Sequence, residues 1–412
     1  MGFEDITLKD KTKAYIIALV VGSGGFYTGY LTSIFNPIGT PLLRDDYKLD
    51  KKEIAYALGN INLFFSLGGL VSVLGFGYLF DILGRKKSLI LSEIMTVGAS
   101  LCYCIKFIPC LYLARFISGL SAGVNVSGAS VLLGELLPKS VSGFGGIFIY
   151  TSITFAILVS YLQQTFFSQE FMGKHWRIFL IWPLILSFIR IILLLKFVPM
   201  ETPQFYLARI TNNDQILKET LINVLSPLYE SSQIEEEVDK LIAENKVDKK
   251  ETSFLQLFSS RYLYRTIGGC LINLSEQFCG VNFLVFFSTD LFNEISNNGE
   301  FMTTVLGVAN FFGSFIAIYA VQKFGRRFNI VTGVLVQLLS FSLLSWAIFY
   351  NNKILPAFCV TLYMLGFAMG IGPTIIPYCA DILPPMGVGF AKAFQWIGSS
   401  TVAKVSPILE QK

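Results

Sequence analysis

Two short charged stretches, each set between long apolar runs, decide the fold of this chain. The first is DILGRKKS at Asp81–Ser88, and the second is QKFGRRFN at Gln322–Asn329. Each stretch places a glycine directly before two or three basic residues, and each joins two apolar runs of helical length. Because the second stretch lies in the other half of the chain, the repeat indicates that one structural unit occurs twice.

The composition is typical of a chain that crosses a membrane several times. Of the 412 residues, 53% are hydrophobic and only 15% are charged, whereas soluble domains carry about 25% charged residues. The basic residues behind the net charge of +4 are scattered, which argues against the clustered basic face of a nucleic-acid-binding protein. One histidine and seven cysteines without metal-ligand spacing predict neither a metal site nor a cofactor.

Eleven apolar runs are long enough to cross a bilayer as helices. Six precede a charge-rich segment and five follow it, which predicts an all-α membrane protein in three parts. These parts are a six-span bundle at 1–198, a helical bridge at 199–265 and a second bundle at 266–412. Basic residues gather on the side of the bridge, so we expect the N-terminus and the bridge to be cytoplasmic. We expect the plasma membrane rather than an internal membrane.

Further matched segments support the duplication. GYLTSIFN, which begins at Gly29, resembles GVNFLVFF at Gly280, and GELLPKSVSG at Gly134 resembles ADILPPMGVG at Ala380. The matches keep their order, which predicts two pseudo-symmetric helical bundles, the plan of the major facilitator fold. The chain stops after the eleventh run, so the expected second half lacks a twelfth span, through truncation, an incomplete gene prediction or decay of the copy.

The basic turns predict a gate at the cytoplasmic ends of the bundles. Its candidate residues are Asp81, Arg85, Glu135, Glu201, Arg326, Arg327 and Asp381. Arg85 can reach Glu135, the acid that ends the fourth span, and Arg326 or Arg327 can reach Asp381 in the second half. Such pairs would hold the halves closed on that side and break when it opens. The alternative is that these charges serve only to anchor the cytoplasmic side.

Several motifs together resemble the sugar porter family of the major facilitator superfamily. GYLFDILGRKK and QKFGRR resemble the family's two charged loops, PMETPQFYL resembles its motif after span 6, and EQFCGVNFLVFFST resembles its span 7 motif. Each motif is weak by itself, but their order and spacing over nearly the whole chain are specific. The resemblance implies transport of a sugar without chemical change, so we expect no enzyme activity.

The resemblance also implies which residues bind the sugar. Carried over onto this sequence and extended by an aromatic of span 7, they are Tyr150, Glu276, Gln277, Asn282, Phe286, Asn310, Gln395 and Trp396. Uncharged amides both donate and accept hydrogen bonds, which suits a ring of hydroxyl groups. An aromatic ring such as Trp396 or Phe286 can cover the C–H face of a sugar. The alternatives are hydrogen bonds between helices for the amides and simple packing for the aromatics.

Two positions depart from the proton-coupled members of that family. Those members carry an aspartate in span 1 where GYLTS has Leu31, which cannot titrate, so a passive uniporter is expected. The first glutamine of the span 7 motif is replaced by Glu276, and burial favours the protonated form of a lone carboxylate. Glu276 could act as a substitute proton site, as a neutral hydrogen-bonding acid or as the partner of Arg115.

The leading hypothesis is uniport of a monosaccharide by alternating access. Two alternatives stay open, namely proton-coupled symport of a sugar or polyol through Glu276, and a non-transporting sugar sensor or inactive truncated copy. The expected partners are a small sugar and the lipid bilayer, with no nucleic acid and no need for an oligomer. The sequence does not identify the sugar.

Overall fold

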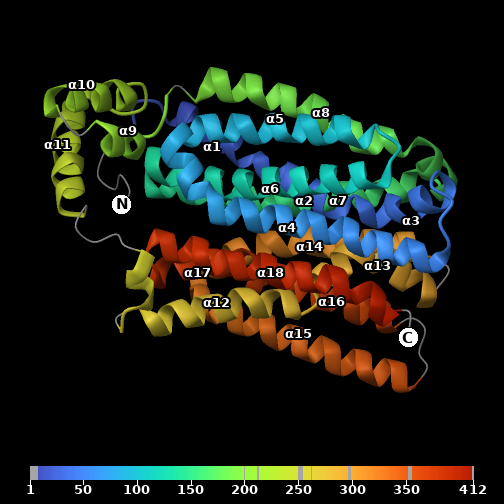
Figure 1. The fold of residues 1–412 in the computed structure, drawn as a ribbon. Helices are drawn as coiled ribbons and strands as arrows, with labels where there is room; N and C mark the ends of the chain where they lie inside the picture. Colours follow the sequence, from blue (N-terminus) through green and yellow to red (C-terminus); the bar gives the residue numbers. More distant parts are fainter. Residues whose placement is uncertain are drawn as a thin grey trace.

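Two bundles of helices lie against each other along their length, with the first half of the chain above the second in Figure 1. The computed structural model describes residues 8–198, 200–210, 213–248, 254–260, 262–295, 298–350 and 355–410. The described residues are almost entirely helical, apart from an isolated bridge between Leu8 and Tyr229. The all-α membrane fold expected from the sequence is confirmed.

The helices follow the division expected from the apolar runs. The first half contains α1 (Lys11–Gly22), α2 (Gly24–Ser33), α3 (Phe35–Asp45), α4 (Lys51–Leu83), α5 (Arg85–Tyr103), α6 (Ile108–Leu136), α7 (Lys139–Phe166) and α8 (Gln169–Phe197). The bridge contains α9 (Pro203–Arg209), α10 (Asp214–Leu225), α11 (Ser231–Asp248) and the short 3-10 helix η1 (Phe254–Phe258). The second half contains α12 (Leu263–Phe278), α13 (Val281–Ile295), α14 (Gly299–Phe324), α15 (Arg326–Phe349), α16 (Leu355–Met369), α17 (Ile371–Ile382) and α18 (Pro385–Glu410).

Within the described residues, nine helical stretches are long and apolar enough to cross a membrane. The remaining two runs of the sequence analysis form α5 and α18, which carry more polar residues. α5 begins with three basic residues and holds Glu93, and α18 holds Lys392 and Lys404. Lys404 donates a hydrogen bond of 2.6 Å to Asn60 and lies over the ring of Tyr56 on α4, so its charge has partners within the protein.

Three of the expected spans are interrupted rather than continuous. The first run divides into α1 and α2, with α3 following directly, the seventh divides into α12 and α13, and the tenth divides into α16 and α17. Gly280, with a φ of 94°, separates α12 from α13, and Gly370 separates α16 from α17. Broken helices inside a transport bundle release backbone groups toward its interior, which is where substrates bind in this class of fold.

The two turns that place a glycine before basic residues, at Asp81–Ser88 and Gln322–Asn329, adopt the same backbone conformation at that glycine. Gly84 has φ 93° and ψ 172°, and Gly325 has φ 83° and ψ 169°. Residues with a Cβ atom rarely adopt this region, so glycine is required at both turns. Because the turns join α4 to α5 and α14 to α15, the second and third spans of each half, the repeat in the sequence is a repeat in the structure.

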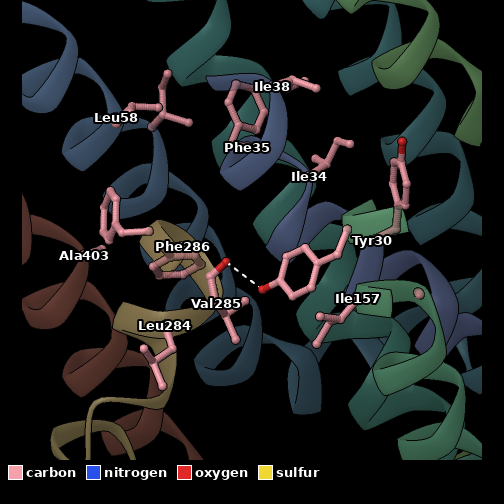
Figure 2. Packing of buried hydrophobic residues seen from close by; sticks show 14 of the residues in the cluster. Tyr30, Ile34, Phe35, Ile38, Leu58, Ile157, Leu284, Val285, Phe286 and Ala403 are labelled. Carbon is pink, nitrogen blue, oxygen red and sulfur yellow. Dashed lines mark hydrogen bonds between the residues drawn. The ribbon is translucent and has the colours of Figure 1, made fainter. Parts of the chain in front are cut away.

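The two large buried apolar clusters of the described residues differ in the parts of the chain that they join. The bridge helices α9–α11 mark the bridge end, and α3 lies at the opposite end (Figure 1). At the opposite end, one buried cluster holds side chains from both halves, and Figure 2 shows Ile34 and Phe35 near Val285 and Phe286. The cluster at the bridge end consists of residues from the first half and from α9, α10 and α11. The first cluster therefore packs the two halves together, and α4 of the first half also packs against α18 of the second.

Candidate functional site

A cavity of about 180 Å³ lies between the two halves. Its wall includes Thr28 and Phe65 from the first half, and α12, α13, α14, α16, α17 and α18 from the second. The eight binding residues selected from the sequence, Tyr150, Glu276, Gln277, Asn282, Phe286, Asn310, Gln395 and Trp396, all line it. The structure therefore brings these residues together, and their role in binding remains a proposal.

The amides of the cavity are held by contacts between helices. The Asn282 Nδ2 group donates to Gln277 Oε1 and, at 2.7 Å, to the Ser399 hydroxyl on α18. Ser399 also lies 2.8 Å from the hydroxyl of Ser66 on α4. This chain of bonds runs from the second half to the first, so it fixes the orientation of the Asn282 amide against both bundles.

Two polar atoms on the cavity wall have no hydrogen-bond partner within the described residues. They are Oδ1 of Asn310, a residue that is 3% exposed, and the indole Nε1 of Trp396. Trp396 reaches this position because Gly69 on α4 has no side chain, and a Cβ atom there would lie 2.5 Å from the indole. Buried polar atoms are almost always satisfied, so one acceptor and one donor are available here to a ligand.

Glu276 lies in the cavity at 6% exposure, and its carboxylate accepts hydrogen bonds of 2.9 Å from Gln395 to both of its oxygens. The positive charge of Lys392, which also lines the cavity, attracts this carboxylate. The pairing of Glu276 with Arg115 considered in the sequence analysis is wrong. The Arg115 side chain bonds to Leu31 O, Ile61 O and Asn62 Oδ1 instead.

Lys392 is the functional candidate that the sequence analysis missed. It precedes Gln395 by three residues on α18 and therefore lies on the same face of that helix. A lysine on the cavity-facing side of an apolar run was the signal that could have identified it, because charged residues inside spans are expensive and usually functional.

The chain is similar to known transport proteins. The family described as "Sugar (and other) transporter" matches residues 17–412. The chain belongs to this family. It is therefore a multi-pass membrane protein that transports a sugar, and the members of its family are transporters rather than enzymes.

Individual relatives and solved structures agree with this assignment. The transporter is 28% identical over 381 residues to the galactose-proton symporter of Escherichia coli K12, covering 88% of this chain and 78% of the relative. It is 25% identical over 416 residues to the glucose transporter GlcP of Staphylococcus epidermidis, covering 97% and 88%. The xylose transporter XylE from E. coli, in a partially occluded inward open conformation, matches with a TM-score of 0.78 at 19% identity, covering 97% and 93%. The major facilitator fold is thereby confirmed.

Three of the candidate gate residues, Arg85, Glu135 and Glu201, lie at the bridge end around the N-terminus of α5. Arg85 makes an ion pair of 2.8 Å with Glu135, and their side chains are 11% and 18% exposed. The Glu201 carboxylate accepts bonds of 2.9 and 3.0 Å from the backbone N–H groups of Lys86 and Lys87. Glu201 thus caps the N-terminus of α5, where the helix dipole favours a negative charge.

In the second half, Arg326 pairs with Asp381 and donates to the backbone oxygen of Pro377. Asp81 and Arg327 are exposed and make no ion pair among the residues that the structure describes. Each observed pair joins helices of a single half. In this conformation the pairs therefore stabilise each bundle internally. They do not bridge the two halves, although a gate that holds the halves closed is expected from the sequence.

Bonds between the halves of the transporter cross the opposite end instead. Asn36 on α3 donates to Val285 O at 2.9 Å and to the Ser288 hydroxyl at 2.8 Å, and it accepts from the Thr289 N–H at 3.2 Å. Tyr161 on α7 donates to Val285 O at 3.0 Å, the bond drawn as a dashed line in Figure 2. These contacts join the two halves at the opposite end.

Proposed function

We propose that this transporter carries a neutral monosaccharide by alternating access, as a uniporter. The observation that carries the proposal is a cavity between two similar bundles that hydrogen bonds join at one end. Its wall holds several amides and two polar atoms without a partner among the described residues. A sugar hydroxyl donates and accepts at once, so it can satisfy both the Asn310 oxygen and the Trp396 N–H. Rocking of the bundles would then expose the sugar to each side in turn.

Leu31 supports uniport over proton coupling. It is 2% exposed, and its backbone oxygen accepts a hydrogen bond from Arg115. The side chain at this position carries no proton, and the Arg115 guanidinium is satisfied by neutral oxygens of Leu31, Ile61 and Asn62. Protonation at this position therefore cannot drive the transport cycle.

Proton-coupled symport through Glu276 is the second candidate. Glu276 is a buried acid on the cavity wall beside Lys392, and a relative of the transporter is named a galactose-proton symporter. Coupling would require the proton on Glu276 to move with the sugar. The Gln395 amide, which contacts both carboxylate oxygens, supports the alternative of a fixed hydrogen-bonding role.

The orientation follows from the basic residues near the bridge. We propose that the bridge end and the N-terminus face the cytoplasm, as the positive-inside rule predicts, and that the protein resides in the plasma membrane. The opposite end then faces outward. On this assignment, the bonds of Asn36 close the outer side of the cavity.

Uptake of radiolabelled sugars into proteoliposomes tests the proposal. A uniporter brings D-glucose, D-galactose or D-fructose only to equal concentrations inside and outside, with or without an inward proton gradient, and Glu276→Gln behaves in the same way. Accumulation that requires the proton gradient in the wild type, and that Glu276→Gln abolishes, would establish symport instead. The absence of saturable uptake for every sugar would refute both forms of transport.

A further inference from the structure

Lys392 and Glu276 place opposite charges on one wall of the cavity. Glu276 belongs to α12 and Lys392 to α18, and these two helices pack directly against each other. Both residues line the cavity, and their opposite charges attract each other. The remaining binding candidates on the second half are uncharged, so this pair is a distinct feature of the site.

Both groups have hydrogen-bonding capacity for a ligand in the cavity that they line. The Nε2 group of Gln395 donates to the two oxygens of Glu276 at 2.9 Å each. A carboxylate has about four acceptor positions, and an ammonium has three donors. After the contact with Gln395, the carboxylate can still accept from a ligand, and Lys392 can donate to one.

The opposite charges also restrict the class of ligand. An isolated buried charge is costly, but a pair of opposite sign is tolerated. An acidic substrate would meet the Glu276 carboxylate, and a basic substrate would meet the Lys392 ammonium. A neutral ligand avoids both electrostatic penalties if one of its groups donates to the carboxylate and the neighbouring group accepts from the ammonium. Two hydroxyl groups on adjacent carbon atoms have this property.

We propose that Lys392 is a specificity-determining residue that, together with Glu276, binds two adjacent hydroxyl groups of the sugar. The ammonium donates to one hydroxyl oxygen, and the carboxylate accepts the proton of the neighbouring hydroxyl. This inference rests on the proposed transport of a neutral monosaccharide. It adds that charged groups bind the hydroxyl groups at two adjacent ring carbons, whereas amides bind the hydroxyl groups at the other carbons.

Charge-assisted hydrogen bonds are about twice as strong as neutral ones. Removal of a hydroxyl that bonds to a charged group should weaken binding by about 10- to 150-fold. The analogue without that hydroxyl is rejected because the buried charge loses a partner. The transporter should therefore discriminate most strongly against two monodeoxy sugars, with the missing oxygens on neighbouring carbons.

The test compares inhibition of uptake by every monodeoxy analogue of the hexose that the wild type transports best. The variants are Lys392→Met, which keeps the apolar stem, and Glu276→Gln. Lys404→Met is the matched control, since Lys404 lies on the same helix but bonds to Asn60 and does not line the cavity. The double variant with both cavity substitutions removes the pair without leaving an unpaired charge, which guards against failure to fold.

Lys392→Met should bind the parent hexose about 10- to 150-fold more weakly than the wild type does. The deoxy analogue that lacks the hydroxyl bound by Lys392 should bind equally well to this variant and to the wild type. Glu276→Gln should remove the discrimination against the analogue deoxygenated at the adjacent carbon. The double variant should remove the discrimination against both deoxy analogues. Lys404→Met should retain the wild-type order of analogues. An equal loss for all analogues in Lys392→Met, or loss at carbons that are not adjacent, overturns the inference. A wild type that binds no hexose refutes the proposed function itself, which is a separate result.

Discussion

Substitution of Asn36 by alanine should shift the transporter away from the conformation described here. The Asn36 side chain makes four hydrogen bonds to α13, with Leu284, Val285, Ser288 and Thr289. Each is worth about 0.5–1.5 kcal/mol. The Val285 oxygen and the Thr289 N–H also bond within α13 itself, so we take the loss as about 1–3 kcal/mol. That loss reduces the population closed at the opposite end by about 5- to 150-fold relative to the alternative state.

Hydrogen–deuterium exchange measures this shift directly. In Asn36→Ala the backbone amides of α3 and α13 should exchange faster than in the wild type, because the opposite end opens more often. Asn329→Ala is the matched control, since Asn329 is also buried but bonds to Met369 O and Thr374 within the second half. It should lower thermal stability without selective exposure of α3 and α13. Unchanged exchange in Asn36→Ala, or the same pattern in Asn329→Ala, would refute the closure role of Asn36.

Three further substitutions test separate parts of the structure. Arg85→Ala should slow sugar exchange and lower the free energy of unfolding by about 1–3 kcal/mol, with sugar affinity unchanged, because Glu135 loses its partner; wild-type exchange and stability would contradict this. Asn282→Ala should weaken sugar binding by about 5- to 150-fold, since a hydroxyl then stays unpaired, and unchanged binding would mean that Asn282 only packs helices. Burial alone would raise the pKa of Asp46, but contacts with Lys106, Trp176 and Arg177 outweigh it and lower that pKa below its usual 3.8. A lowered carboxyl pKa stabilises the fold above that value, so Asp46→Asn should be less stable at neutral pH, and the difference should vanish as the pH falls through the lowered pKa. A difference that persists in acid would contradict it.

The arrangement of helices was predictable because it follows from local patterns. Apolar length gives the spans, and a glycine before basic residues gives the turns at Gly84 and Gly325. The binding candidates such as Asn282 and Asn310 could be selected because motif spacing assigns each to a known helix and face. That these residues line one cavity depends on how the helices pack. The packing could be predicted from the sequence only through the family resemblance.

Partners across helices were harder to predict. Arg115 bonds to Leu31 O and not to Glu276, because helix tilt sets which side chains of two helices come within reach. The same holds for Lys392, whose place in the cavity depends on the rotation of α18. The breaks in the first, seventh and tenth runs were missed because hydropathy does not distinguish a continuous span from an interrupted one.

The central claim is that one cavity is exposed to the two sides of the membrane in turn. Counterflow measures this most directly, using proteoliposomes loaded with a high concentration of an unlabelled hexose and diluted into a trace of the same labelled sugar. Alternating access predicts a transient rise of labelled sugar inside above its outside concentration, with no proton gradient present. A rise that never exceeds the outside concentration, at a sugar concentration that saturates uptake, would contradict the account.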